Sequence, residues 1–190
     1  MKKGMIFIDG SNVFYDWKKA TAGKQLDIQK YIEQVKRKYM NIDFVRTYYF
    51  TTQTSTNVNF LQQINKIPYT QAVTGRLQNK TIKIDTRAGI KCSHCGGDVV
   101  DTFVTQVDKG TDVNIAVEML KHAYNKAYDI AVLISRDADF AGVVKIIKDL
   151  GQNVELVLFE DSKGDAQELT ETVDNITLIT RSEYSSLERI

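Results

Sequence analysis

The chain has 190 residues, of which 43% are hydrophobic and 26% are charged, and this is enough apolar material for one domain with a packed core. It contains a single proline, so a proline-rich linker or stalk is excluded. The 25 basic and 24 acidic residues nearly cancel, which argues against a protein that binds nucleic acid through bulk positive charge alone.

Two cysteines are too few for a disulfide framework, and such a low number favours a reducing compartment. The four apolar residues from Met5 to Ile8 are too few for the apolar core of a signal peptide. No apolar run approaches the ~18 residues that a membrane span requires. We therefore expect a cytoplasmic protein that has no association with the membrane.

The first 70 residues alternate between apolar runs of strand length and segments with helical spacing. Asp9-Gly10 follows the first run and reads as a turn, Asp27 is placed to cap a helix, and Pro68 ends another. The predicted elements are a strand at 5–8, a helix at 28–39, a strand at 44–50 and a helix at 57–67.

Residues from about 70 to 107 break this alternation. Short β-like runs at 71–74, 81–84 and 99–107 are separated by glycines, which predicts a β-rich excursion such as a hairpin. We place the inserted segment at about 75–107.

The alternation then resumes. A helix is predicted from Thr111, as its cap, to about Ala127, and the run at 130–134 is continuously apolar, as expected of a parallel strand covered on both faces. The apolar face of this helix is assigned to Val113, Ala116, Val117 and Leu120. The remaining predicted elements are helices at 140–150, 165–172 and 182–190 and strands at 154–159 and 176–179. Strands that alternate with helices predict an α/β fold with a mostly parallel central sheet, whose functional residues lie beyond the carboxyl ends of the strands.

Four aspartates fall at those strand ends. Asp9 follows the first strand, Asp137 and Asp139 follow the strand at 130–134, and Asp112 begins the long helix. Each of them alone is explained by a helix cap or a turn. Together they indicate a cation site, because like charges brought together repel one another unless a cation lies between them. Oxygen ligands without histidine suit Mg²⁺ or Mn²⁺ rather than zinc, and such ions support phosphodiester hydrolysis.

Several other catalytic classes lack their residues. The chain has no glycine-rich nucleotide-binding motif and no H-E-x-x-H motif. Its two histidines, His94 and His122, make a histidine-based nucleophile triad improbable. His122 follows Glu118 by four positions, which predicts a surface pair on one helix.

Three motifs in this order resemble the NYN domain family, a branch of the PIN-like nucleases that includes the bacterial LabA-like proteins. They are Phe7-Ile8-Asp9-Gly10-Ser11-Asn12, Lys109-Gly110-Thr111-Asp112-Val113 and Ser135-Arg136-Asp137-Ala138-Asp139-Phe140. The resemblance covers residues from about 4 to 159. It implies one PIN-like domain over 1–190, with its core at about 4–180, built as a three-layer sandwich with helices on both faces of the sheet.

The resemblance also implies a divalent-metal site and metal-dependent cleavage of RNA. Its acidic ligands would be Asp9, Asp112, Asp137 and Asp139, while Asn12 would orient a metal-bound water or a phosphate and Ser135 would support the site. Two positions depart from the family pattern. Arg136 replaces a glycine, and its guanidinium would either bind a substrate phosphate or pair with an acid in competition with the metal. Glu118 stands where the family often has aspartate, and we leave it out of the site.

The segment between Gly75 and Gly97 is basic, with five lysines and arginines against Asp85 alone. It is either a clamp for an RNA backbone beside the acidic site or a solvated hairpin whose lysines discourage edge pairing. The aromatic residues Phe14, Tyr15 and Trp17 are likewise either base-stacking groups or helix packing. The predicted RNA-binding residues are Arg76, Lys80, Lys83, Arg87, Lys91, Lys109 and Arg136.

The same segment contains Cys92-Ser93-His94-Cys95-Gly96-Gly97. Three alternatives are open for the two cysteines: plain reduced thiols, half of a structural zinc site, or a redox pair. The redox role needs a helix N-terminus, which the two glycines disfavour. Structural zinc wants four ligands, so two chains about a two-fold axis, a homodimer, would supply four thiolates.

Three functions compete for this sequence. The first is an endoribonuclease that depends on Mg²⁺ or Mn²⁺ and has RNA as its partner. The second is a non-catalytic PIN-like regulatory module that binds RNA or a protein, a reading that Arg136 favours. The third and weakest is a metal-dependent phosphatase, which lacks the D-x-D-x-T start of an aspartyl-phosphate enzyme because Asp9 is followed by Gly10-Ser11.

Overall fold

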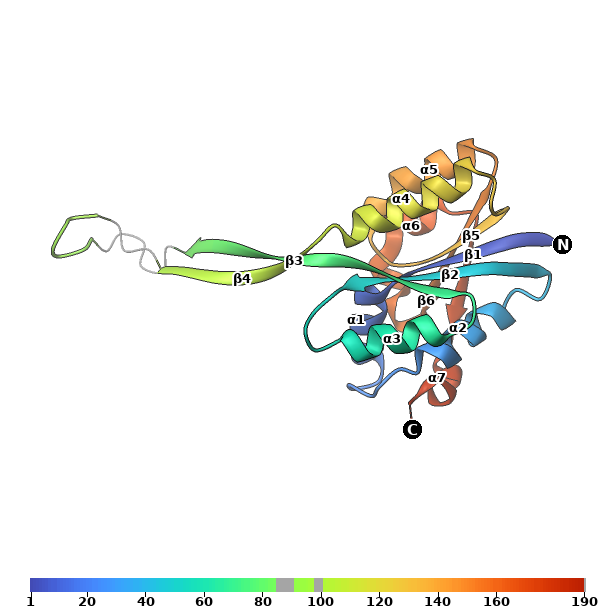
Figure 1. Ribbon diagram of the computed structural model, residues 1–190, viewed down its shortest axis with the longest axis horizontal. Helices are drawn as coiled ribbons and strands as arrows, with labels where there is room; N and C mark the ends of the chain where they lie inside the picture. Colours follow the sequence, from blue (N-terminus) through green and yellow to red (C-terminus); the bar gives the residue numbers. More distant parts are fainter. Residues whose placement is uncertain (85–90, 98–100, 190) are drawn as a thin grey trace.

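The computed structural model describes residues 1–84, 91–97 and 101–189 (Figure 1). Over these ranges the strands are β1 (Lys2–Asp9), β2 (Ile42–Thr52), β3 (Thr70–Ile84), β4 (Asp101–Lys109), β5 (Ile130–Ile134), β6 (Asn153–Phe159) and β7 (Asn175–Ile179). The helices are α1 (Gly10–Ala20), α2 (Ile28–Arg37), α3 (Val58–Lys66), α4 (Thr111–Tyr124), α5 (Ala141–Asp149), α6 (Gln167–Thr172) and α7 (Arg181–Leu187), with 3-10 turns at Ala138–Phe140 and Glu160–Ala166.

The described strands form one seven-stranded sheet in the order β4-β3-β2-β1-β5-β6-β7. Neighbouring strands are parallel except for β3 and β4, which are antiparallel. This is the mostly parallel α/β fold that the alternation predicts. The chain builds outward from β1 to β3 and then returns to β5 on the other side of β1. The β1–β5 junction is therefore a topological switch point, where the carboxyl ends of the strands commonly frame a ligand site.

Helices cover both faces of the sheet, so the central strands bury side chains in two cores (Figure 1). Along β1, Ile6 and Ile8 point to one core and Met5 and Phe7 to the other, and all four are at most 6% exposed. The first core also contains Trp17 of α1, Tyr31 of α2 and Leu187 of α7, and the second contains Met119 of α4, Val144 of α5 and Leu169 of α6. None of the helices in the described ranges is long and apolar enough to cross a membrane.

The predicted β-rich excursion is a long hairpin that projects from the body (Figure 1). β3 pairs with β2 from Thr70 to Gly75 and with β4 from Arg76 to Ile84, so one continuous strand replaces the two short runs expected at 71–74 and 81–84. We call the paired segments Arg76–Ile84 and Asp101–Lys109, with the loop that joins them, the arm. Parts of the expected strand at 99–107 lie outside the described residues.

Two predictions about helix starts are wrong. Asp9-Gly10 is not an isolated turn, because Asp9 is the N-cap of α1, a helix that the sequence pattern did not reveal. Thr111 is not the cap of α4, because Gly110 occupies that position with a φ of +91°, where glycine is favoured. Thr111 is instead buried, and its hydroxyl donates a hydrogen bond to Asp108 Oδ1 at 2.9 Å.

The predicted apolar face of α4 is wrong for its two valines, whereas Leu120 packs against the second core as predicted. Val113 and Val117 are 63% and 54% exposed, whereas the buried stripe consists of Ile115, Met119 and Ala123. Within α4, His122 Nε2 lies 3.2 Å from Glu118 Oε2, so the predicted pair forms. Both side chains are half-buried rather than at the surface, and the hydroxyl of Tyr48 lies 2.8 Å from the same histidine nitrogen.

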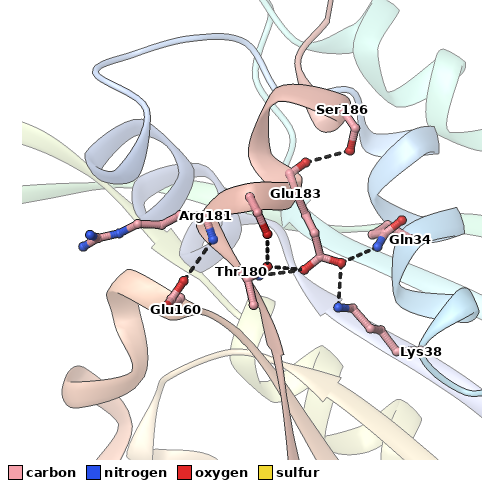
Figure 2. A network of polar contacts seen from close by, with 8 residues as sticks. Gln34, Lys38, Glu160, Thr180, Arg181, Glu183 and Ser186 are labelled. Carbon is pink, nitrogen blue, oxygen red and sulfur yellow. Dashed lines mark hydrogen bonds and ion pairs between the residues drawn. The ribbon is translucent and has the colours of Figure 1, made fainter.

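The carboxylate of Glu183 joins the C-terminal helix α7 to α2 (Figure 2). One oxygen accepts hydrogen bonds from the Thr180 amide at 2.7 Å and the Thr180 hydroxyl at 2.9 Å. The other lies 2.6 Å from Lys38 Nζ and accepts a hydrogen bond from Gln34 Nε2. Burial alone raises the pKa of Glu183, but these donors outweigh burial and lower it from 4.5 to about 2.

Glu183→Gln is therefore expected to destabilise the protein at neutral pH. Because the pKa is lower in the folded state, the charged group stabilises the fold above pH 4.5, and this stabilisation is lost as the pH falls towards 2. After allowance for solvent screening, we expect a loss of about 1–2 kcal/mol at pH 7. Urea unfolding of both proteins between pH 7 and 2.5 should show the difference shrinking with acid. Glu168→Gln, on the exposed face of α6, is the matched control.

Candidate active site

Asp9 ends β1 and anchors the start of α1. Its Oδ1 accepts hydrogen bonds from the backbone amides of Ser11 and Asn12, each at 3.1 Å. Its Oδ2 accepts from the side-chain amide of Asn12 and from Ser135 Oγ, the latter at 3.0 Å. Asp9 is 1% exposed, so a buried negative charge is held by four donors. The motif Asp-Gly-Ser-Asn thus has a structural role in addition to any chemical one.

The third motif, which begins at Ser135, follows β5, and β5 lies directly beside β1 in the sheet. Ser135 receives a hydrogen bond from the Asp137 amide at 3.2 Å while donating to Asp9, so it ties the two strand ends together. Asp137 Oδ1 accepts from the Asp139 amide at 3.0 Å and caps the short 3-10 turn. The Asp139 side chain is exposed to solvent at the same edge. Ser135 therefore links Asp9 to Asp137, and its support of a metal site stays a prediction.

Asp112 lies in the first turn of α4 and is close enough to the other acids to feel their charge. Burial raises the pKa of Asp112, and the charges of Asp9, Asp137, Asp108 and Asp139 raise it further. The structure thus brings the four predicted acids to one edge of the sheet. Asp108 is a fifth carboxylate, which the sequence reasoning missed although it directly precedes the Lys109-Gly110-Thr111-Asp112 motif.

The acids gather around this edge without closing on a common point. Among the described residues, no three Asp, Glu, His or Cys side chains lie close enough to hold a metal ion as they stand. At Asp9 the reason is visible, since its four acceptor positions are already occupied by hydrogen bonds. Asp112 and Asp139 are both exposed to solvent, although part of the Asp112 carboxylate is shielded from water by the protein. A set of carboxylate oxygens suits a hard cation such as Mg²⁺ or Mn²⁺.

Arg136, the residue that departs from the family pattern, contacts α1. Its Nε lies 3.1 Å from both Asn12 Oδ1 and Asp16 Oδ1. Asp16 is 5% exposed, and a buried carboxylate needs a cationic or hydrogen-bonding partner. Arg136 therefore pairs with an acid, as one alternative held, but that acid is Asp16, outside the predicted ligand set. The contact also fixes the side chain of Asn12 beside Asp9.

A groove of about 1090 Å³ lies at the base of the arm, and none of the five acids is among its lining residues. The residues after β2, the middle of β3 and the β4–α4 junction line it, including Arg76, Lys109 and Asn114. Arg76 and Lys109 are directly opposite each other on β3 and β4, and both are exposed. Like charges placed opposite each other repel, so an anion between them would relieve that repulsion.

Three of the other predicted RNA-binding residues lie along the arm. Lys80 is exposed and shares the face of Arg76, because residues four apart on a strand point the same way. Lys83 lies on β3, further from the groove. Arg87 lies outside the described residues, and Lys91 is in the loop at the far end. The structure thus brings Arg76 and Lys109 to the groove, leaves Lys80, Lys83 and Lys91 along the arm, and places Arg136 against α1.

The three aromatic residues of α1 separate into two groups. Phe14 and Tyr15 are 59% and 62% exposed. Their rings contact each other edge to face, with 5.4 Å between the ring centroids. Stacking on bases stays a prediction for these two. Trp17 is 2% exposed, and its indole nitrogen donates to the Lys24 carbonyl at 2.8 Å, so Trp17 packs in the core and is unavailable to a ligand.

Comparisons with known proteins concern the family and the fold of this chain. The family model of the NYN domain matches residues 3–180, nearly the whole chain. The crystal structure of a protein of unknown function from Vibrio parahaemolyticus is similar over 94% of this chain and 93% of that one, with 19% sequence identity and a TM-score of 0.62. That likeness concerns the fold alone. No curated protein matches the sequence.

Proposed function

Since this chain belongs to the NYN domain family, which includes nucleases of the PIN-like superfamily, we propose that it is a ribonuclease that depends on a divalent metal. NYN nucleases generally depend on such ions. The observation that carries the proposal is the effect on Asp112, whose pKa is raised by burial and then by the charges of four other carboxylates at the switch point of the sheet. An arrangement of mutually repelling acids is stabilised by a bound cation.

In this proposal Asp112, Asp137 and Asp139 would hold Mg²⁺ or Mn²⁺, and Asp9 would be a fourth ligand. The ion would supply an activated water and stabilise the leaving oxygen of the phosphodiester. Asn12, which contacts Arg136, would orient that water or a phosphate oxygen.

The groove at the base of the arm is the proposed path of the RNA strand. Its lining includes Lys109 and Gly110, which directly precede the first turn of α4, where Asp112 lies. Arg76 and Lys109 would neutralise a backbone phosphate and so position the neighbouring phosphodiester at the acids. This placement is how a chain of near-zero net charge can still bind RNA locally.

The proposal is tested with purified protein and end-labelled RNA, both single-stranded and structured. Cleavage is expected with Mn²⁺ or Mg²⁺, should stop on addition of EDTA, and should return when the ion is restored in excess. Absence of metal-dependent cleavage across varied RNAs would contradict it. Cleavage that continues in EDTA would contradict the metal mechanism specifically.

One observation favours a second candidate, a non-catalytic PIN-like regulatory module that binds RNA or a protein. The Asp9 carboxylate is fully hydrogen-bonded, as expected of a residue kept for the fold. This candidate predicts RNA or partner binding that EDTA leaves unchanged, with no cleavage. A gel-shift assay performed in parallel with the cleavage assay distinguishes the two.

Arg76→Ala is expected to weaken RNA binding about three- to tenfold, with a loss that is similar for all sequences. Removal of one phosphate contact should lower the slope of log affinity against log salt by about 0.7 for a single strand. Fluorescence anisotropy at several salt concentrations measures both quantities. Lys2→Ala, at the start of β1 and thus at the opposite edge of the sheet, is the matched control. Equal effects of the two substitutions would exclude the groove as the RNA path.

A further inference from the structure

The far end of the arm carries both cysteines of the chain in a tight turn. The Cys92 amide donates to the Gly97 carbonyl, and the Gly96 amide donates to the Cys92 carbonyl, each at 2.8 Å. Gly96 adopts a φ of +70°, a left-handed conformation that a glycine accommodates without strain. These hydrogen bonds close the turn on itself.

The two cysteine side chains interact with each other, and the Cys92 side chain also interacts with the backbone of Cys95 and His94. Cys95 is exposed and Cys92 is partly exposed, so the pair is open to a ligand.

We propose that this turn is half of a zinc site, and that a second copy of the chain completes it with the same two cysteines. A structural zinc ion takes four ligands in a tetrahedron, and thiolates are preferred. The chain has two cysteines in all, and no described group of three or more acidic, histidine or cysteine side chains could hold an ion. A two-fold axis through the ion turns two thiolates into four, and the contact closes as a symmetric dimer.

The length of the arm keeps the proposed zinc site away from the body of the protein. Nine residue pairs separate the loop from the body, which corresponds to a length of roughly 30 Å at 3.4 Å per residue. Side chains of the body are therefore out of reach of an ion at the end of the projecting arm (Figure 1). Each arm begins at a groove of its own chain, so the proposed dimer connects two such grooves through the arms.

The zinc site is independent of the proposed ribonuclease function, and its test needs no RNA. Protein purified in reducing buffer with added Zn²⁺ and no chelator should contain one zinc per two chains by elemental analysis and have the mass of a dimer by light scattering. X-ray absorption should show four sulfur ligands at about 2.3 Å. A strong zinc chelator should convert the dimer to monomer, and renewed Zn²⁺ should restore it.

Substitutions in the turn distinguish the role of the two cysteines from that of the neighbouring histidine. Cys92→Ser and Cys95→Ser should each abolish zinc binding and dimer formation, whereas His94→Ala should retain both. The thermal midpoint of the body should be unchanged in all three, because the turn lies outside both cores. The proposal is overturned if zinc is absent, if one zinc binds per chain, if His94→Ala loses the metal, or if the dimer survives both chelation and the cysteine substitutions.

Discussion

Asp112→Asn is expected to lower the rate of RNA cleavage at least about 100-fold and to leave the fold at least as stable as the native protein. The loss of activity follows from the proposed ligand set. A neutral amide cannot replace a carboxylate as a ligand of a divalent ion, and the charge of that ion stabilises the transition state. Asp112 is the acid of choice for this test. Unlike Asp9, it is exposed, and its side chain does not tie the strand ends together.

The stability half of this expectation follows from the sign of the pKa shift. Burial and then the neighbouring carboxylates raise the pKa of Asp112, so its negative charge destabilises the folded state at every pH above the ordinary value of 3.8. Asparagine removes that charge but also a favourable interaction with the start of α4. Because the side chain is exposed, we expect a net gain between zero and about 1 kcal/mol at pH 7 without divalent ions.

Three measurements check this expectation: cleavage rate, urea unfolding in EDTA, and the change in thermal midpoint on addition of Mn²⁺. The native protein should be stabilised by the ion, and Asp112→Asn should not be. Asp43→Asn is the matched control, since Asp43 is exposed near the start of β2, at the opposite edge of the sheet. Full activity of Asp112→Asn would exclude its role as a ligand. A loss of activity accompanied by a large loss of stability would mean that the residue serves the fold.

The elements that the sequence predicted best are those whose signals are local. The run at 130–134 is continuously apolar, and it forms β5 over that range because a central parallel strand is buried on both faces. Asp27 caps α2 through a hydrogen bond to the Lys30 amide, as its position predicted. Convergence of the acids could also be foreseen, because the carboxyl ends of parallel strands meet at one edge.

The wrong predictions concern features of the structure that are determined by residues distant in the sequence. Helix α4 carries two apolar stripes, and the sheet decides that Ile115 and Met119 are buried while Val113 and Val117 face solvent. Arg136 meets Asp16 and Asn12 across more than 100 residues, so its pairing has no local signal. Arg136 departs from the family pattern in the sequence, and in the structure it is the partner of a buried acid, Asp16.

Gly10→Ala is expected to destabilise the protein by about 1–3 kcal/mol and to lower cleavage further than the loss of folded protein explains. A Cβ at this position would lie 2.6 Å from the Phe50 carbonyl oxygen and 2.7 Å from the Tyr49 ring. Phe50 pairs with Asp9 between β1 and β2, so its carbonyl cannot yield without disturbing the sheet. The start of α1 would have to move instead, and it carries the amides that bind Asp9.

Gly142→Ala is the matched control because its position, in the first turn of α5, has no atom within 4 Å of an added Cβ. Alanine is a better helix former than glycine, so this substitution should stabilise the protein by up to about 1 kcal/mol and leave cleavage unchanged. Urea unfolding and cleavage rates well below the thermal midpoint measure the two effects. The same propensity acts in favour of alanine at position 10, so a loss there isolates the steric contact. If Gly10→Ala is as stable and as active as the native protein, the close approach of α1 to β2 does not position Asp9.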